Sequence, residues 1–263
     1  MSDFSIINLF INWHKNRRKQ FRKLKFIFFF EPDYVNMEII NQWIAFKGNP
    51  FPFMRIQGKT KDFSFQDDYF NFIDYDSLRD NPIYIYGPAS KYSYLDQIFT
   101  IGLTDQRLTA QINFDYISND FSFVNYYMNF HGFIAASLYE NNYVLWQSER
   151  VPGHYKYKGG LKIFRNQYGE KEVDLSDRPG RRAHHPKFTY CGASQMWFGE
   201  AFYNIIPKEK ICSFDKALAI NQLENNVLHV HLYETIFDGD RPDNQAVQRA
   251  FREHLEIDKI TTY

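Results

Sequence analysis

The chain has 263 residues, of which 44% are hydrophobic and 24% charged, a balance typical of one large folded domain or two small ones. Its 31 basic and 31 acidic residues give a formal net charge of +0, which argues against a chain drawn as a whole to nucleic acid or to a membrane surface. Two cysteines are too few for disulfides to stabilise a chain of this size. The sequence does not begin with the basic and then apolar residues of a secretory signal peptide, so we expect a cytoplasmic protein without disulfides.

The opening segment, residues 2–25, has the apolar spacing of a helix and a basic second half, residues 14–25. Residues 1–31 hold seven Lys and Arg against Asp3 and Glu31, which is a net charge of +5, so the remainder of the chain carries −5. The basic half can grip phosphates or anionic lipid, or it can be a solvated face beside the acidic remainder. We favour the solvated face.

Short apolar segments follow. LKFIFFF, residues 24–30, is an unbroken apolar run that predicts a buried strand and is too short to cross a bilayer. Residues 35–47 space Val35, Ile39, Trp43 and Phe46 as a helix. Between residues 51 and 118, punctuation by Gly, Pro, Asp and Asn predicts the strands FPFMRIQG, DFSFQ, NPIYIYG and LTAQINFDYI.

In the second half of the chain, two apolar runs around Asn141-Asn142 predict a β-hairpin over residues 133–148, because Asn tolerates the left-handed backbone of a tight turn. A similar string recurs at Asn225-Asn226, where residues 213–224 predict a helix that ends at the Asn pair before a strand. Residues 195–206 predict a helix that buries Trp197, Phe198 and Phe202, and residues 243–260 predict an amphipathic helix.

These elements interleave without strict alternation. They predict an α+β fold with a mainly antiparallel sheet and several packed amphipathic helices. We expect a single domain over residues 1–263, with a weak subdivision in the Gly- and charge-rich stretch 151–186 as the one plausible boundary.

The strongest chemical signal is VLHVHLYE, residues 227–234. On a strand, Leu228, Val230 and Leu232 face the core, while His229 and His231 share the other face, where two imidazoles can chelate one ion. Glu234 points away, so a third ligand would have to come from elsewhere. The candidates are Asp238, Asp240, His131 and the pair His184-His185. We expect no metal and no cofactor, and keep a metal-dependent hydrolase or nuclease using His229 and His231 as the alternative.

Cys191 raises the question of a thiol nucleophile, since His184 and His185 precede it and a predicted helix follows it. The residues after Cys191 do not follow a papain-like pattern, so a small buried cysteine is the expectation. Phosphate-loop, dinucleotide-binding, nucleophile-elbow and paired-cysteine zinc motifs are all absent from the sequence. We therefore expect no enzymatic activity.

At LSDRPGRR, CGASQMWFGEAFY, LENNVLHVHLYE and RAFREHL the second half of the chain resembles the cytosolic immunity proteins encoded beside bacterial polymorphic and contact-delivered toxins. The resemblance is one of general character and carries no family residues across. It implies a stoichiometric inhibitor that binds a cognate toxin and blocks its active site.

Abundant aromatic residues, 19% of the chain, support this hypothesis because Tyr and Trp often contribute to interfaces, although an AT-rich genome gives the same bias. The predicted contact residues come from the hairpin rim and from the loop 177–185. They are Tyr139, Tyr143, Trp146, Asp177, Arg181, Arg182, His184 and His185. For the two arginines the alternative is a solvated turn.

Overall fold

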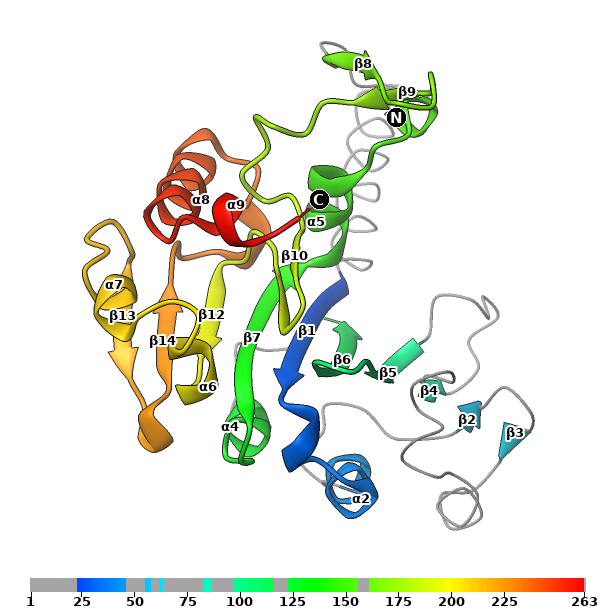
Figure 1. Ribbon diagram of the computed structural model, residues 1–263, viewed down its shortest axis with the longest axis vertical. Coiled ribbons are helices and arrows are strands. Elements are labelled where there is room, and N and C mark those ends of the chain that lie inside the picture. The colour runs from blue at the N-terminus through cyan, green and yellow to red at the C-terminus, as the bar shows by residue number, and fades with distance from the viewer. Residues whose placement is uncertain are drawn as a thin grey trace, which may run out of the picture.

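The computed structural model describes residues 23–45, 55–57, 62–63, 83–86, 97–115, 123–155 and 161–262. Its main element is a sheet in which ten strands run in the order β13-β14-β12-β7-β1-β6-β5-β4-β2-β3 (Figure 1). Each neighbouring pair is antiparallel. With the helices that pack on it, this sheet confirms the predicted α+β class.

In chain order the strands of the main sheet are β1 (Lys23–Phe30), β2 (Arg55–Gln57), β3 (Asp62–Phe63), β4 (Ile83–Tyr86), β5 (Gln97–Leu103), β6 (Leu108–Asp115), β7 (Phe133–Glu140), β12 (Gln195–Phe198), β13 (Ala219–Gln222) and β14 (Leu228–His231). Two small hairpins form separate two-stranded sheets, β8 (Ile163–Arg165) with β9 (Lys171–Val173) and β10 (Ala183–His185) with β11 (Phe188–Tyr190).

The α-helices are α2 (Met37–Ala45), α4 (Phe123–Met128), α5 (Asn141–Ser148), α6 (Glu200–Tyr203), α7 (Lys208–Cys212), α8 (Pro242–His254) and α9 (Ile257–Ile260). Single turns of 3₁₀ helix occur at η1 (Pro32–Tyr34), η3 (Pro152–Tyr155), η4 (Glu224–Asn226) and η5 (Ile236–Asp238). Figure 1 shows α8 and α9 near the upper ends of β12 and β14, and α2 and α4 near the lower ends of β1 and β7.

Strand β1 is buried on both faces, as the run LKFIFFF predicts. Leu24, Phe26, Phe28 and Phe30 enter one core cluster, where the Phe30 ring lies 4.5 Å from Trp43 of α2 and the Phe28 ring 4.8 Å from Tyr127 of α4, centroid to centroid. Ile27 and Phe29 enter a second cluster on the opposite face. At the β12–β14 end, the same second cluster contains Phe251 and Leu255, so the C-terminal helix covers that part of the sheet.

Several predicted elements agree with the structure. Helix α2 and strand β14 lie within the segments predicted for them, as do β2, β3, β4 and β6. Strand β1 and helix α8 each begin one residue before the predicted segment, and the helix predicted over residues 243–260 is divided into α8 and α9. Strand β5 was not predicted. Of the predicted opening helix, residues 1–22 lie outside the described residues, while Lys23 to Lys25 begin β1 and do not continue a helix.

The predicted hairpin at Asn141-Asn142 is wrong. Strand β7 ends at Glu140, and Asn141 begins helix α5, which buries Tyr143 and Val144 against the sheet. The left-handed turn that an Asn pair favours occurs instead at the second copy. There Asn225 and Asn226 have φ of 53° and 57° and connect β13 to β14. The helix predicted over residues 213–224 is therefore also wrong, because its second half is strand β13.

The helix predicted over residues 195–206 is wrong at its start but correct in what it buries. Gln195–Phe198 is strand β12, and only Glu200–Tyr203 is helical. Trp197 and Phe198 point to opposite faces, so Trp197 meets Phe26 in the first cluster and Phe198 meets Phe202 in the second. Two buried faces produce the same apolar run as a buried helix, which is why spacing alone misassigned the segment.

We expect Phe202→Ala to lower the free energy of unfolding by about 3–5 kcal/mol, because its ring is fully buried and packs 4.5 Å from Phe198 and 5.0 Å from Phe188. Chemical denaturation of the variant and of wild type measures the difference. Tyr168→Ala is the matched control, since that ring is 79% exposed and its loss should change stability by less than about 0.5 kcal/mol. An equally small effect at Phe202 would contradict the packing.

Candidate functional site

The histidine pair lies on β14 as its spacing predicts. Leu228, Val230 and Leu232 are buried, while His229 and His231 occupy the other face. The His229 ring stacks on Trp197 of β12 with ring centroids 4.5 Å apart and planes 2° apart, and its Nε2 lies 3.0 Å from Oε1 of Gln195. The His231 ring is 6.2 Å from that of His229, and its buried Nε2 has no hydrogen-bond partner among the described residues.

Burial makes both histidines poor proton acceptors. It lowers the pKa of His229 to about 4, with the nearby His231 as a smaller cause, and it also lowers the pKa of His231. Neutral imidazoles are the form that binds metal. Within the described part of the chain, however, no group of three His, Cys, Asp or Glu side chains lies close enough to hold an ion. The alternative of a metal-dependent hydrolase therefore has two ligands and no third among these residues.

Cys191 is buried at the end of β11, and burial raises the pKa of its thiol to about 12. A thiol with this pKa stays protonated near neutral pH and is a poor nucleophile. The helix that was expected to begin near Met196 and lower its pKa is strand β12.

Two of the predicted contact residues belong to the core. Tyr139 and Tyr143 are 3% and 8% exposed, so the prediction of a rim there is wrong, because the hairpin that would have carried the rim does not exist. The Tyr143 hydroxyl donates a hydrogen bond to Oε1 of Gln248 at 3.0 Å and so joins α5 to α8. Trp146 is half-buried against the ring of Tyr155.

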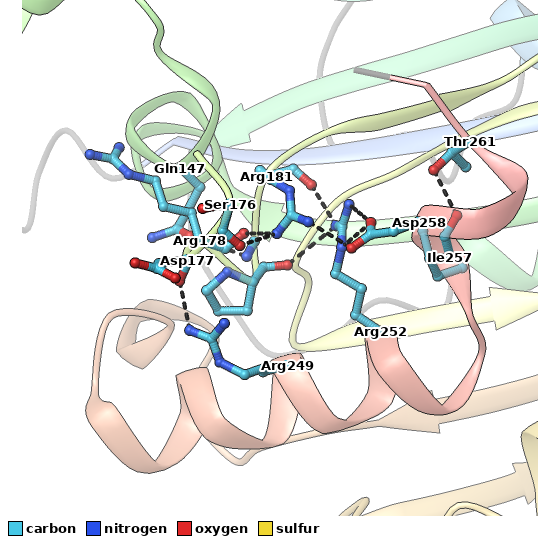
Figure 2. Close-up of polar contacts among 12 residues, drawn as sticks. Gln147, Ser176, Asp177, Arg178, Arg181, Arg249, Arg252, Ile257, Asp258 and Thr261 are labelled. Atoms are coloured by element: carbon cyan, nitrogen blue, oxygen red, sulfur yellow. Dashed lines mark hydrogen bonds and ion pairs between the residues drawn. The ribbon is translucent and has the colours of Figure 1, made fainter. Parts of the chain in front are cut away.

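Arg181, a third predicted contact, is also buried. Its Nη2 lies 2.6 Å from Oδ2 of Asp258, while Nε of Arg252 donates to Oδ1 of the same carboxylate at 2.7 Å (Figure 2). Arg181 also donates to the carbonyl oxygens of Ser176 and Arg178. This network ties the loop after β9 to the C-terminal helices. The prediction of a surface contact or a solvated turn at Arg181 is therefore wrong.

The remaining predicted contacts lie apart from one another. Asp177 is exposed and pairs with Lys162, and its carbonyl oxygen accepts a hydrogen bond from Arg249 at 2.6 Å (Figure 2). His184 is exposed on β10, whereas His185 stacks on Phe188 with centroids 4.9 Å apart. Arg182 is half-buried, with its backbone N–H on Oγ of Ser148. The loop 177–185 therefore does not form one contact surface. Asp177 is exposed, Arg181 belongs to a buried network, and residues 183–185 form strand β10.

A different surface emerges around the hairpin β8–β9. Seven large apolar side chains are exposed in the described part of the chain, and five of them fall between residues 145 and 168. These five are Leu145, Val151, Ile163, Phe164 and Tyr168. We call the segment that carries them, α5 through β9, the apolar arm. The sequence spacing did not single it out, because all three residues of β8 are exposed and show no inside–outside alternation.

The arm is held firmly at its base. Tyr155 of η3 is 4% exposed, and its hydroxyl donates to the carbonyl oxygen of Glu149 at 2.6 Å. Val173 of β9 is 1% exposed, and its N–H donates to the carbonyl oxygen of Arg150 at 2.9 Å. The pair Arg150–Glu172 closes the same junction. Exposed apolar groups on a fixed base are typical of a binding surface.

The sequence matches no family model, and comparisons with curated proteins and with solved structures return no significant match. Among the described helices, none combines the length and the apolar character that a membrane crossing requires.

We predict that the purified protein holds no metal in stoichiometric amount, because the pair His229 and His231 has no third ligand in the described residues. Elemental analysis after mild dialysis measures this. One equivalent of zinc, manganese or iron, lost in a His229→Ala/His231→Ala double variant, would instead establish the metal site.

A pH dependence follows from the buried His229. Its pKa is about 4 in the folded chain against 6.5 for the unperturbed group, so between these values the unfolded state binds more protons and stability falls as pH falls. We expect His229→Gln to lose less stability than wild type across this window, measured by denaturant unfolding at several pH values. Equal losses in both proteins would show that His229 does not titrate this way.

Proposed function

We propose that this protein acts in the cytoplasm by binding one protein partner tightly through the apolar arm, and that the partner is a cognate toxin whose active site it blocks. The observation that carries the proposal is the concentration of exposed apolar side chains on the arm. Large apolar groups presented on a fixed base bury area on binding without an ordering cost at the base.

The chemistry of the arm suits a protein surface. Phe164 and Tyr168 supply aromatic area, while the arginine and carboxylate groups at the base supply a polar rim. Interfaces combine apolar centres with polar rims in this way, and aromatic residues dominate their energetics. Two of the contacts predicted from sequence belong to this region: Trp146 lies in α5 of the arm, and Asp177 follows β9. Asp177 pairs with Lys162, and Trp146 packs on Tyr155.

The partner is tested by co-expressing the product of the adjacent gene with and without this protein. We expect that product to arrest growth alone, and to be harmless and co-purify when both are made. Survival of cells that carry the product alone, or failure of the two to co-purify, would sink the proposal.

The arm is tested with Phe164→Ser/Tyr168→Ser. Because both rings are exposed, we expect the double variant to keep its thermal stability while the dissociation constant of the complex rises by on the order of 30-fold. Leu218→Ser is the matched control, since Leu218 is 53% exposed but precedes β13 at the far edge of the sheet. If the control weakens the complex as much as the arm variant, the arm is not the interface.

A further inference from the structure

A cavity of about 520 Å³ opens on the sheet face opposite the aromatic cluster. Register places its floor across three strands. Ile27 of β1 pairs with Gln111 of β6, which pairs with Thr100 of β5. Phe29 of β1 likewise pairs with Thr109, which pairs with Gly102. The hairpin β10–β11 forms one wall and contributes His184 and Thr189. Among the described residues, the C-terminal helix packs on this sheet face at the β12–β14 end, and the cavity lies over the β5–β6–β1 part.

The cavity gathers cations. Lys25, Arg107 and Arg182 line it together with His184, and no carboxylate belongs to the described residues of its lining. Burial and the nearby Arg182 lower the pKa of Lys25, and burial lowers the pKa of Arg107. Arg107 and Arg182 in turn lower the pKa of His184, after the larger effect of burial. These groups therefore lie within electrostatic range of one another and repel.

Neutral partners hold the cations in place. Nζ of Lys25 donates to Oε1 of Gln111 at 3.1 Å, and Nη1 of Arg107 donates to the His185 carbonyl oxygen at 3.0 Å and to Thr189 at 3.2 Å. The Arg182 side chain hydrogen-bonds Tyr139. Such bonds orient the charges without neutralising them. The unfavourable free energy of packing these charges together is removed when an anion binds among them.

We propose that this cavity binds a small phosphorylated organic molecule. Three basic side chains match a phosphate monoester, which carries about −1.5 to −2 charge at neutral pH, better than a single carboxylate. Guanidinium forks and threonine hydroxyls are suitable donors to its oxygens. The cavity volume exceeds that of phosphate alone and lies in the range of small-ligand sites, so Ile27 at its floor can contact an organic part. This site is separate from the apolar arm and does not rest on the toxin proposal.

Ribose 5-phosphate and inorganic pyrophosphate are the probes, used at constant ionic strength with the full-length protein. We expect at least one of them to bind with a dissociation constant below about 1 mM by calorimetry and to raise the melting temperature, while ribose does neither. If neither probe binds in this range, the proposal is wrong. Tighter binding of glutarate or of an acidic peptide than of both phosphates would also overturn it, by assigning the cavity to carboxylates.

Lys25→Met and Arg182→Gln locate the binding. Each should weaken phosphate binding by on the order of tenfold to a hundredfold, because each removes a charge-assisted hydrogen bond. Removing one of several repelling cations should leave the melting temperature of the ligand-free protein unchanged or higher, which a purely structural role would not produce. If Lys25→Met fails to fold, Arg182→Gln alone tests whether phosphate binds in the cavity.

Lys171→Met is the matched control, an exposed lysine on β9 outside the cavity, and it should bind as wild type does. Undiminished binding in both cavity variants would place the ligand elsewhere and overturn the proposal. The arm variant Phe164→Ser/Tyr168→Ser should bind phosphate as wild type does. Phosphate binding therefore tests the cavity, and complex formation tests the arm, independently of each other.

Discussion

The alternation of side chains along β1 is the constraint on which the rest of the molecule depends. Because successive residues of a strand face opposite ways, Leu24, Phe26, Phe28 and Phe30 build an aromatic layer with α2 and α4, and Ile27 and Phe29 face the other side. Lys25 has to share that second face. A strand paired on both sides cannot rotate a single residue away, so the lysine is held at the sheet surface, where it lines a cavity.

Two groups of arginines illustrate how the protein handles buried positive charge. Arg181 and Arg252 share the carboxylate of Asp258, and each also donates to carbonyl oxygens of the loop after β9, so that they form a compensated network that stabilises the C-terminal half. Arg107 and Arg182 have only neutral partners among the described residues. Breaking the first network would leave a buried charge unpaired. The second group is half-buried and has no carboxylate partner among the described residues, and for this reason it points to a ligand.

Tight backbone contacts hold these two regions in a fixed relation. A methyl group on Gly192, just after Cys191, would lie 2.1 Å from Oε1 of Gln248 and 2.4 Å from Cα of Gly180. The hairpin β10–β11 is also fastened along β10, where His184 and Thr262 exchange two backbone hydrogen bonds. The cavity wall, the loop 177–182, the C-terminal helix and α5, where the apolar arm begins, therefore form one packed unit.

The sequence by itself determined those elements whose apolar pattern fits only one kind of secondary structure. An unbroken apolar run predicted β1, alternation predicted β14 with its histidines on one face, and amphipathic spacing predicted α8. Tertiary packing decided the rest. Asn141 begins a helix because Tyr143 and Val144 find a core to enter, while Asn225 makes the turn. Arg181 is buried because Asp258, 77 residues away, meets it, and Lys25 lines a cavity because strands distant in sequence pair around it. The spacing of residues along the chain indicates which side chains are buried, but it does not identify the distant residues that they contact.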